Sequence, residues 1–194
     1  MKIEPLSISG IWMCTPQVHP DDRGAFLEWF RGDRLEEATG RRFQVAQANH
    51  SVSQRGVVRG VHFADVPPGQ AKYVYCPDGA VIDVIVDLRV GSPTFGASEA
   101  VLLDDTNRRG LFIAEGLGHA FCSLRDDTSL SYLVSTVYRP ASEHAVNPFD
   151  PALALPWNDH VDTPIASPRD LEAPTFAEAE RDGLLPNFAD CVDL

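Results

Sequence analysis

Two histidines stand in strand-like segments where an imidazole could transfer protons. His62 ends the segment Arg59-Gly60-Val61-His62, and His119 lies among apolar residues in 116–121. A histidine has an ordinary pKa of about 6.5, so its imidazole can accept a proton from a substrate at neutral pH. Taken alone, a histidine at a strand end is more often structural, hydrogen-bonded to a neighbour.

A lysine and two tyrosines add further groups that could act on protons or charge. Lys72 and Lys2 are the only lysines among 16 basic residues. A strand lysine is usually an exposed edge residue, but in a pocket its charge could stabilise an oxyanion. Tyr132 and Tyr138 share parity on a strand expected over 129–138, which puts them on one face about 20 Å apart. A strand tyrosine is most often a core residue.

The spacing of the histidines argues against a metal centre. Small β-barrels of the cupin type hold a divalent metal with two histidines two residues apart, a nearby carboxylate and a third histidine. Here the segment reads His62-Phe63-Ala64, without the second histidine and without a following glutamate. Two separated histidines make a weak metal site. We therefore predict a pocket with no metal and no cofactor. A metal-dependent isomerase or oxygenase is the alternative.

The segments that carry these residues are predicted to be short β-strands. Gly- and Pro-rich turns separate them, and no long helices alternate with them, which favours an antiparallel sandwich or barrel such as a jelly roll. The expected strands are 44–49, 57–62, 71–76, 80–88, 97–103, 110–114, 119–124 and 129–138. Two short helices are expected, one from an Asp33 N-cap to Gly40, the other over 175–183 with a Thr175–Glu178 capping box.

Asp83 is unusual because it interrupts the apolar strand 80–88. Side chains alternate between the two faces of a strand. Its carboxylate therefore either meets solvent or points into a polar interior, and the pattern favours neither.

The composition indicates one soluble domain over residues 1–194. A net charge of −12 argues against nucleic acid or an anionic membrane as partner. No run approaches the roughly 18 apolar residues of a membrane span, and residues 1–10 carry no apolar signal segment. The cysteines form no CxxC pair, as expected of idle thiols in a reducing compartment. We expect a cytoplasmic protein. The cysteines are Cys14, Cys76, Cys122 and Cys191.

Several stretches, in order over nearly the whole chain, resemble the dTDP-4-dehydrorhamnose 3,5-epimerase family of metal-free cupins. They are DRGAFLE at 22–28, QAN at 47–49, GVVRGVH at 56–62, QAK at 70–72, DVIVDLR at 83–89, SPTFG at 92–96, GHAF at 118–121, 132–138, Glu143 and SPRD at 167–170. The resemblance implies an all-β, cupin-type jelly roll with a few short peripheral helices. It also implies a homodimer that epimerises a dTDP-4-keto-6-deoxyhexose at C3, C5 or both, in deoxysugar biosynthesis.

The resemblance also implies a role for individual residues. His62 resembles the general base, Asp170 the carboxylate that orients it, and Tyr132 the general acid. Lys72 resembles the group that stabilises the enolate, and Asp83 would act behind the residues that touch substrate. Tyr138 would stack on the thymine, and the Arg23 region would reach the partner's site. The implied substrate contacts are Arg23, Phe26, Glu28, Gln47, Asn49, Arg59, His119, Tyr138, Glu143 and Arg169.

The sequence leaves two questions open, namely whether Arg59 and His62 share a face and which carbon is epimerised. Regular alternation puts Arg59 and His62 on opposite faces, unless Gly60 permits a bulge. Departures from the common family pattern, such as Phe63-Ala64 and Tyr75, resemble the branch that makes unusual deoxysugars for natural products, which includes enzymes acting at C3 only or C5 only. A non-catalytic nucleotide-sugar binding protein is a further alternative, although both His62 and Tyr132 are present.

Overall fold

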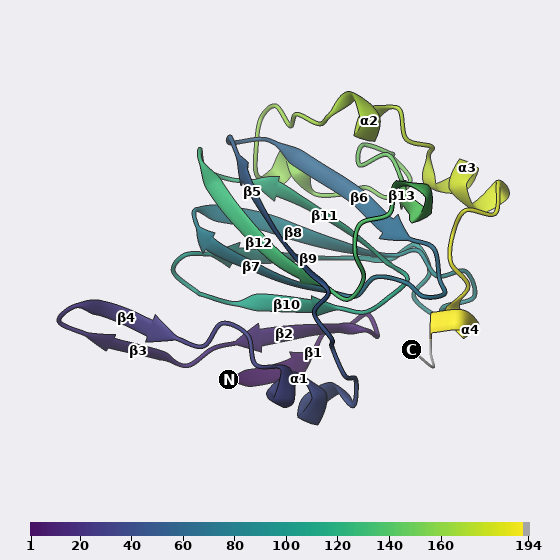
Figure 1. The fold of residues 1–194 in the computed structure, drawn as a ribbon. Coiled ribbons are helices and arrows are strands. Elements are labelled where there is room, and N and C mark those ends of the chain that lie inside the picture. The colour runs from purple at the N-terminus through teal and green to yellow at the C-terminus, as the bar shows by residue number, and fades with distance from the viewer. Residues whose placement is uncertain (192–194) are drawn as a thin grey trace.

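Two antiparallel sheets face each other in the computed structural model, which describes residues 1–191 (Figure 1). The six-stranded sheet has the order β1-β2-β10-β7-β12-β5, formed by Lys2–Pro5, Ile11–Thr15, Gly110–Ile113, Lys72–Asp78, Thr128–Val134 and Gln47–Ser53. The five-stranded sheet has the order β13-β6-β11-β8-β9, formed by Glu143–Ala145, Val58–Ala64, Leu117–Ser123, Ala80–Asp87 and Ser98–Asp104. The all-β jelly-roll class predicted from the sequence is confirmed.

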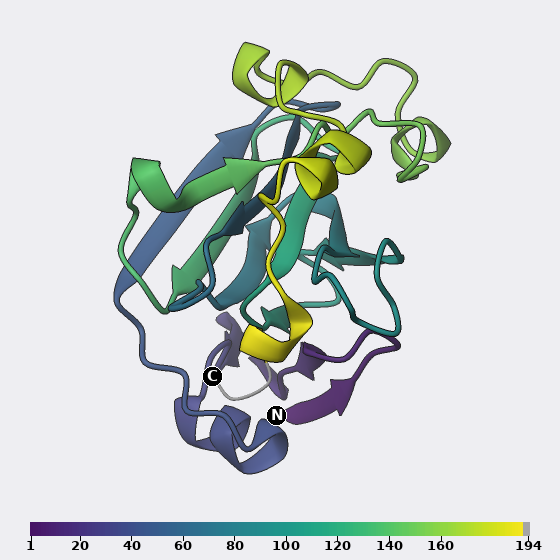
Figure 2. The ribbon, with the colours of Figure 1, turned by 90° about the vertical axis from the view of Figure 1, so that its right-hand side faces the viewer.

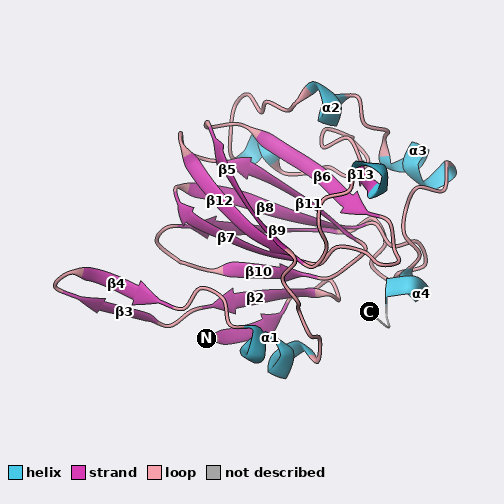
Figure 3. Cartoon of the chain, viewed as in Figure 1, coloured by secondary structure: helices cyan, strands magenta, loops and turns pink. Residues whose placement is uncertain are grey.

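The helices are short and lie at the periphery (Figure 3). They are α1 (Gly32–Thr39), α2 (Pro168–Leu171), α3 (Phe176–Arg181) and α4 (Phe188–Cys191), with 3-10 turns at Pro140–Ser142 and Trp157–Asp159. Figure 2 shows the C-terminal segment, which carries α2 to α4, running along one side of the sandwich. No helix in residues 1–191 is long and apolar enough to cross a membrane.

Apolar side chains form three layers of core. One layer lies between the sheets and includes Val74 of β7 and Ile85 of β8. A second lies between the outer face of the five-stranded sheet and the C-terminal segment, where Trp157 and Val84 pack. The third lies around Leu35 of α1, outside the six-stranded sheet. The five-stranded sheet is thus covered on both faces, which explains why every residue of β8 is buried.

The two predicted helices are both present, but only one of them starts as the sequence predicted. The Thr175–Glu178 capping box is present at α3, and Gly40 ends α1 with a φ of 71°. The predicted Asp33 N-cap is wrong, because α1 begins earlier and its N-cap is Arg31. The Arg31 guanidinium binds the Asp33 carboxylate, with Nη2 and Oδ2 2.6 Å apart, so the carboxylate pairs with the side chain of the residue that takes the N-cap position.

All eight predicted strands exist with shifted ends, but five others were not predicted. These are β1, β2 and β13 together with the hairpin strands β3 (Val18–Asp21) and β4 (Gly24–Leu27). They are three to five residues long, too short to display a clear alternation. The predicted strand 129–138 is wrong at its end, because β12 stops at Val134. Tyr138 therefore lies beyond the strand, and the 20 Å separation from Tyr132 on one strand face does not apply.

Candidate active site

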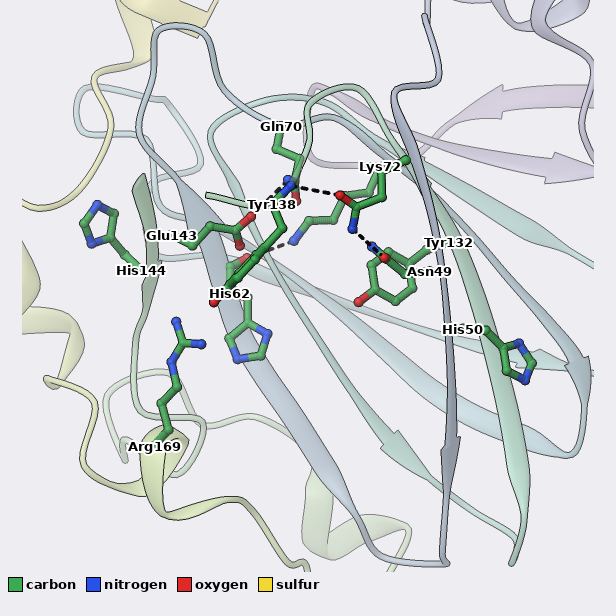
Figure 4. Close-up of a pocket in the computed structure, with 11 residues that line it drawn as sticks. Asn49, His50, His62, Gln70, Lys72, Tyr132, Tyr138, Glu143, His144 and Arg169 are labelled. Atoms are coloured by element: carbon green, nitrogen blue, oxygen red, sulfur yellow. Dashed lines mark hydrogen bonds between the residues drawn. The ribbon is translucent and has the colours of Figure 1, made fainter. Parts of the chain in front are cut away.

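A pocket of about 350 Å³ opens between the two sheets (Figure 4). Strands β5, β7 and β12 line it from one sheet, strands β6 and β13 line it from the other, and Arg169 of α2 reaches it from the C-terminal segment. A second pocket of about 190 Å³ shares His62, Lys72 and Tyr132 with this first pocket. The second pocket is completed by Ser51, Arg59, His119 and Phe121.

A bulge in β6 brings Arg59 and His62 to the same pocket. His62 pairs with His119 and Arg59 pairs with Phe121, so Gly60 and Val61 together stand opposite one residue of β11. The extra residue reverses the alternation, and both side chains line the second pocket. Gly60 adopts a φ of 129°, which a residue with a side chain rarely takes. The open question of whether Arg59 and His62 share a pocket is answered by this bulge.

His62 is held from behind by Asp170. Nε2 of His62 lies 2.7 Å from Oδ1 of Asp170, and the Ser167 hydroxyl donates to the other carboxylate oxygen at 3.0 Å. Burial opposes ionisation of Asp170, but these hydrogen bonds outweigh it and hold the Asp170 pKa below its usual range. An ionised Asp170 accepts the Nε2 proton, which leaves Nδ1 as the unprotonated nitrogen of a neutral His62.

Lys72 places an amine at the junction of the two pockets. Its Nζ donates to the His62 carbonyl oxygen at 3.4 Å. Burial lowers the Lys72 pKa to about 8, although the carboxylates of Glu143 and Asp83 oppose the shift. Glu143 is oriented by Gln70, whose Nε2 donates to it at 3.1 Å. Lys72 is therefore largely charged at neutral pH and able to stabilise a developing negative charge.

Tyr132 faces His62 from the opposite sheet. Figure 4 shows both rings directed into the same space, Tyr132 from β12 and His62 from β6. Burial raises the Tyr132 pKa, and the Glu143 carboxylate adds to the shift while Arg59 opposes it. The Tyr132 hydroxyl is therefore protonated at neutral pH and available as a proton donor.

The position of Asp83 decides between the two alternatives left by the sequence. Its side chain is fully buried, and its Oδ2 lies 2.8 Å from Nε2 of His119. Asp83 thus points into the interior rather than to solvent, and it orients His119 toward the second pocket. Within residues 1–191, the other carboxylate oxygen of Asp83 has no hydrogen-bond partner.

Tyr138 stands at the open end of the first pocket. It is 50% exposed, and its backbone N–H donates to Oε1 of Gln47 at 3.0 Å. Gln47 in turn donates to the Asn49 side chain at 2.7 Å. The carboxylate Glu143 and the guanidinium of Arg169 line the same pocket. A flat aromatic ring, amides and a cation thus surround the entrance.

Three of the predicted substrate contacts are not in these pockets. Arg23 and Phe26 lie on the β3–β4 hairpin, which projects from the body of the molecule (Figure 1). The Arg23 side chain is 90% exposed and paired with Asp21, and Phe26 is 68% exposed. Glu28 follows the hairpin and pairs with Arg31 at 3.1 Å. Within a single chain, these residues are not brought together with His62.

Several lining residues were not singled out from the sequence. Ser51 follows Asn49 by two positions on β5, and Gln70 precedes Lys72 by two, so period-two alternation could have found both. His144 lines the first pocket and pairs with Asp65, with Nε2 and Oδ1 2.7 Å apart. The only sequence signal that His144 lines the pocket was its position next to Glu143. His50 also borders the first pocket, although it is exposed and lies on the opposite face of β5 from Asn49 and Ser51.

Three histidines near the pockets each contact a carboxylate. His62, His119 and His144 each present Nε2 to one carboxylate. In the described part of the chain, no three His, Cys, Asp or Glu side chains are grouped so that they could hold a metal ion. The cofactor-free expectation stays a prediction that needs an experiment.

The chain is similar to known proteins over nearly its whole length. The family model described as dTDP-4-dehydrorhamnose 3,5-epimerase matches residues 5–178. A dTDP-4-dehydrorhamnose 3-epimerase of Streptomyces niveus is 56% identical over 98% of this chain and 91% of its own length. A crystal structure of a 4-keto-6-deoxy sugar epimerase from the novobiocin cluster of Streptomyces spheroides superposes with a TM-score of 0.96, at 55% identity, over 98% of this chain and 95% of that one.

A third relative was solved with a nucleotide sugar. It is a 3'-monoepimerase of Streptomyces bikiniensis in complex with dTDP-quinovose, with a TM-score of 0.92 and 51% identity. The match covers 96% of this chain and 93% of that one. Similarity at this level extends over nearly the entire sandwich and both sheets that line the pockets.

Proposed function

Because the chain belongs to the dTDP-4-dehydrorhamnose 3,5-epimerase family, we propose that its paired pockets epimerise a dTDP-4-keto-6-deoxyhexose beside the C4 ketone. In this reaction a base removes the proton from C3 or C5, and the electron pair of the C–H bond moves into an enolate. An acid then returns a proton to the same carbon on the other face. Nothing is oxidised or reduced overall, so the chain's own acid and base groups suffice.

The observation that carries the proposal is the placement of His62 and Tyr132 on facing sheets of one pocket. A substrate ring between them would present one face to Nδ1 of His62 and the other to the Tyr132 hydroxyl. That is the arrangement inversion requires, because the proton must leave from one side and return from the other. Acid and base groups held in this way typically contribute about 10²–10⁴-fold each.

Lys72 would stabilise the intermediate between these two steps. Negative charge builds on the ketone oxygen as the enolate forms, and an ammonium in a buried pocket stabilises it more strongly than water would. His119, oriented by Asp83, would contact the sugar from β11. Asp170 would stabilise the imidazolium that His62 becomes after it accepts the proton.

The entrance residues would bind the nucleotide. We assign thymine stacking to Tyr138, since its ring is exposed at the rim, and diphosphate contacts to Arg59 and Arg169 because guanidinium groups pair well with phosphate. The remaining contacts proposed for the nucleotide and sugar are Gln47, Asn49 and Glu143.

A second copy of the chain would complete the site. Arg23, Phe26 and Glu28 sit on or beside a projecting hairpin, and they do not line either pocket of their own chain. We propose a homodimer in which this hairpin lies over the partner's entrance and contributes the arginine there. We further propose that the enzyme acts in the cytoplasm, which agrees with four unpaired, buried cysteines.

The test is incubation with dTDP-4-keto-6-deoxyglucose in D₂O, with deuterium followed at C3 and C5 by NMR. Incorporation with inversion at C3, C5 or both is expected, and the labelled position reports the regiochemistry. His62→Ala is expected to abolish incorporation, since His62 is the group proposed as the base. Absence of label with the wild-type protein, or full label with His62→Ala, would contradict the proposal.

A further inference from the structure

One strand contributes a continuous polar row to the pockets. Alternate residues of β5 point inward, and those on its outer face, including Val52, are exposed. The inward residues are Gln47, Asn49, Ser51 and Ser53. Gln47 and Asn49 bond to each other, and the Ser53 hydroxyl accepts from Nε of Arg59 at 3.2 Å. Ser51 differs from the others, because its buried hydroxyl has no hydrogen-bond partner among residues 1–191.

Three polar neighbours of Ser51 in the second pocket already have partners. His119 is held by Asp83, and His62 by Asp170. Lys72 donates to a backbone carbonyl. A buried hydroxyl without a partner is unfavourable, and it is rare in a native fold unless another molecule satisfies it. A serine hydroxyl also turns readily among three staggered positions, so Ser51 can adjust to an incoming group.

We propose that Ser51 is a positioning residue that hydrogen-bonds the C2 hydroxyl of the substrate's hexose ring. This inference rests on the proposed function and deepens it. The ligand class is a sugar with a free hydroxyl next to its diphosphate-bearing carbon. By holding that hydroxyl, Ser51 fixes the rotation of the ring about its link to the nucleotide, and so determines which carbon faces His62.

The choice of C2 follows from the order of residues along β5. Ser51 lies between Asn49, which lines the first pocket, and Ser53, which holds Arg59. With the diphosphate at Arg59, the anomeric carbon lies at this end of the ring. The nearest ring hydroxyl is then the one on C2, whereas the C4 ketone lies farther along the ring, toward Lys72. A site that hydrogen-bonds a substrate hydroxyl discriminates against the analogue lacking it, because the protein group is then left unpaired.

The test compares kcat/KM for two substrates, dTDP-4-keto-6-deoxyglucose and its 2-deoxy counterpart. Ser51→Ala should lower kcat/KM roughly ten-fold for the first substrate and leave the second almost unchanged, because the lost hydrogen bond exists only with the first. Ser51→Thr keeps a hydroxyl and should restore most of the loss. Ser129→Ala, on the outward face of the neighbouring strand β12, is the matched control and should match the wild type.

Two results overturn the inference while leaving the proposed function intact. One is an equal loss on both substrates, which would assign Ser51 to a different contact. The other is no loss on either. A wild-type protein inactive on both substrates overturns the proposed function and this inference together.

The melting temperature of the ligand-free protein gives a second readout. Ser51→Ala removes an unpaired buried hydroxyl, so the variant should melt at the same temperature as the wild type or above it. A clearly lower melting temperature would mean that the hydroxyl supports the fold, and it would overturn the assignment to the substrate.

Discussion

Nε2 of His62 and Oδ1 of Asp170 lie 2.7 Å apart although 108 positions separate the residues in sequence. The contact forms because the C-terminal segment crosses the outside of β6 and places α2 behind the pocket. It gives a neutral imidazole a defined tautomer, in which Nε2 carries the proton and Nδ1 is left unprotonated.

Asp170→Asn tests that tautomer. The amide has nearly the same shape, but it does not hold the Nε2 proton as a carboxylate does, nor stabilise the imidazolium. Deuterium exchange into the sugar should slow by about 10²–10⁴-fold, with an unchanged circular dichroism spectrum. Wild-type exchange rates in this variant would show that His62 acts without Asp170.

Tyr132→Phe tests the division between acid and base. The ring stays and only the hydroxyl is lost, so packing in the sandwich should hold. His62 can still remove the proton and return a deuteron to the face it left. NMR should therefore show deuterium at C3 or C5 with the starting configuration largely retained. Inversion at the wild-type rate would remove Tyr132 as the acid. Complete loss of exchange would mean that the two residues act as one unit.

The lowered pKa of Lys72 predicts an alkaline limit to activity. The charged amine is the active form, so kcat/KM should fall as pH rises through about 8, where Lys72 deprotonates. The Glu143 carboxylate raises this pKa. Glu143→Gln should therefore move the midpoint of the alkaline limb to lower pH, whatever it does to the maximum rate. Glu180→Gln, an exposed site on α3, is the control. If Glu143→Gln leaves the midpoint unchanged, the alkaline limb does not come from deprotonation of Lys72.

The projecting hairpin predicts complementation between two inactive variants. Arg23→Ala should impair the site of the partner chain, and His62→Ala should inactivate the site of the chain that carries it. Each homodimer of a single variant should therefore have two impaired sites. In a mixed dimer, the site with His62 intact receives Arg23 from the other chain. Random pairing then restores about a quarter of wild-type activity, measured after subunits are mixed and re-equilibrated. Activity equal to the mean of the two parents would rule out a shared site.

Chelation tests the absence of a cofactor. Turnover after dialysis against EDTA should equal that of the untreated protein, because the pocket histidines present Nε2 to carboxylates and the proposed steps use only acid and base groups. If the dialysed protein loses activity and Fe²⁺, Mn²⁺ or Zn²⁺ restores it, the metal-dependent alternative is correct.

The sequence predicted the features that depend on local patterns. Short β-type runs bounded by turns identified eight strands, and all of these except the four-residue β10 are seven or eight residues long. Capping chemistry identified the start of α3. Features set by distant partners were missed. β12 ends at Val134, where its pairing with both β5 and β7 also ends, so Tyr138 leaves the strand. Asp33 is not the N-cap of α1, because the helix begins after Arg31 and the Asp33 carboxylate pairs with the Arg31 side chain. Ser51 gave no signal because an unpaired hydroxyl is a property of its surroundings, not of its residue type.

The bulge at Gly60 keeps His62 on the pocket face of β6. If the bulge were lost at the present chain length, regular alternation would turn His62 to the face where Phe63 now packs. The proposed base would be lost although His62 itself had not been replaced. Substitution at Gly60 threatens this arrangement, since a Cβ there would lie 2.6 Å from the His119 carbonyl oxygen. Efforts to broaden the substrate range of this scaffold should therefore leave β6 untouched and diversify the entrance around Tyr138, where the chain has already left the sheet.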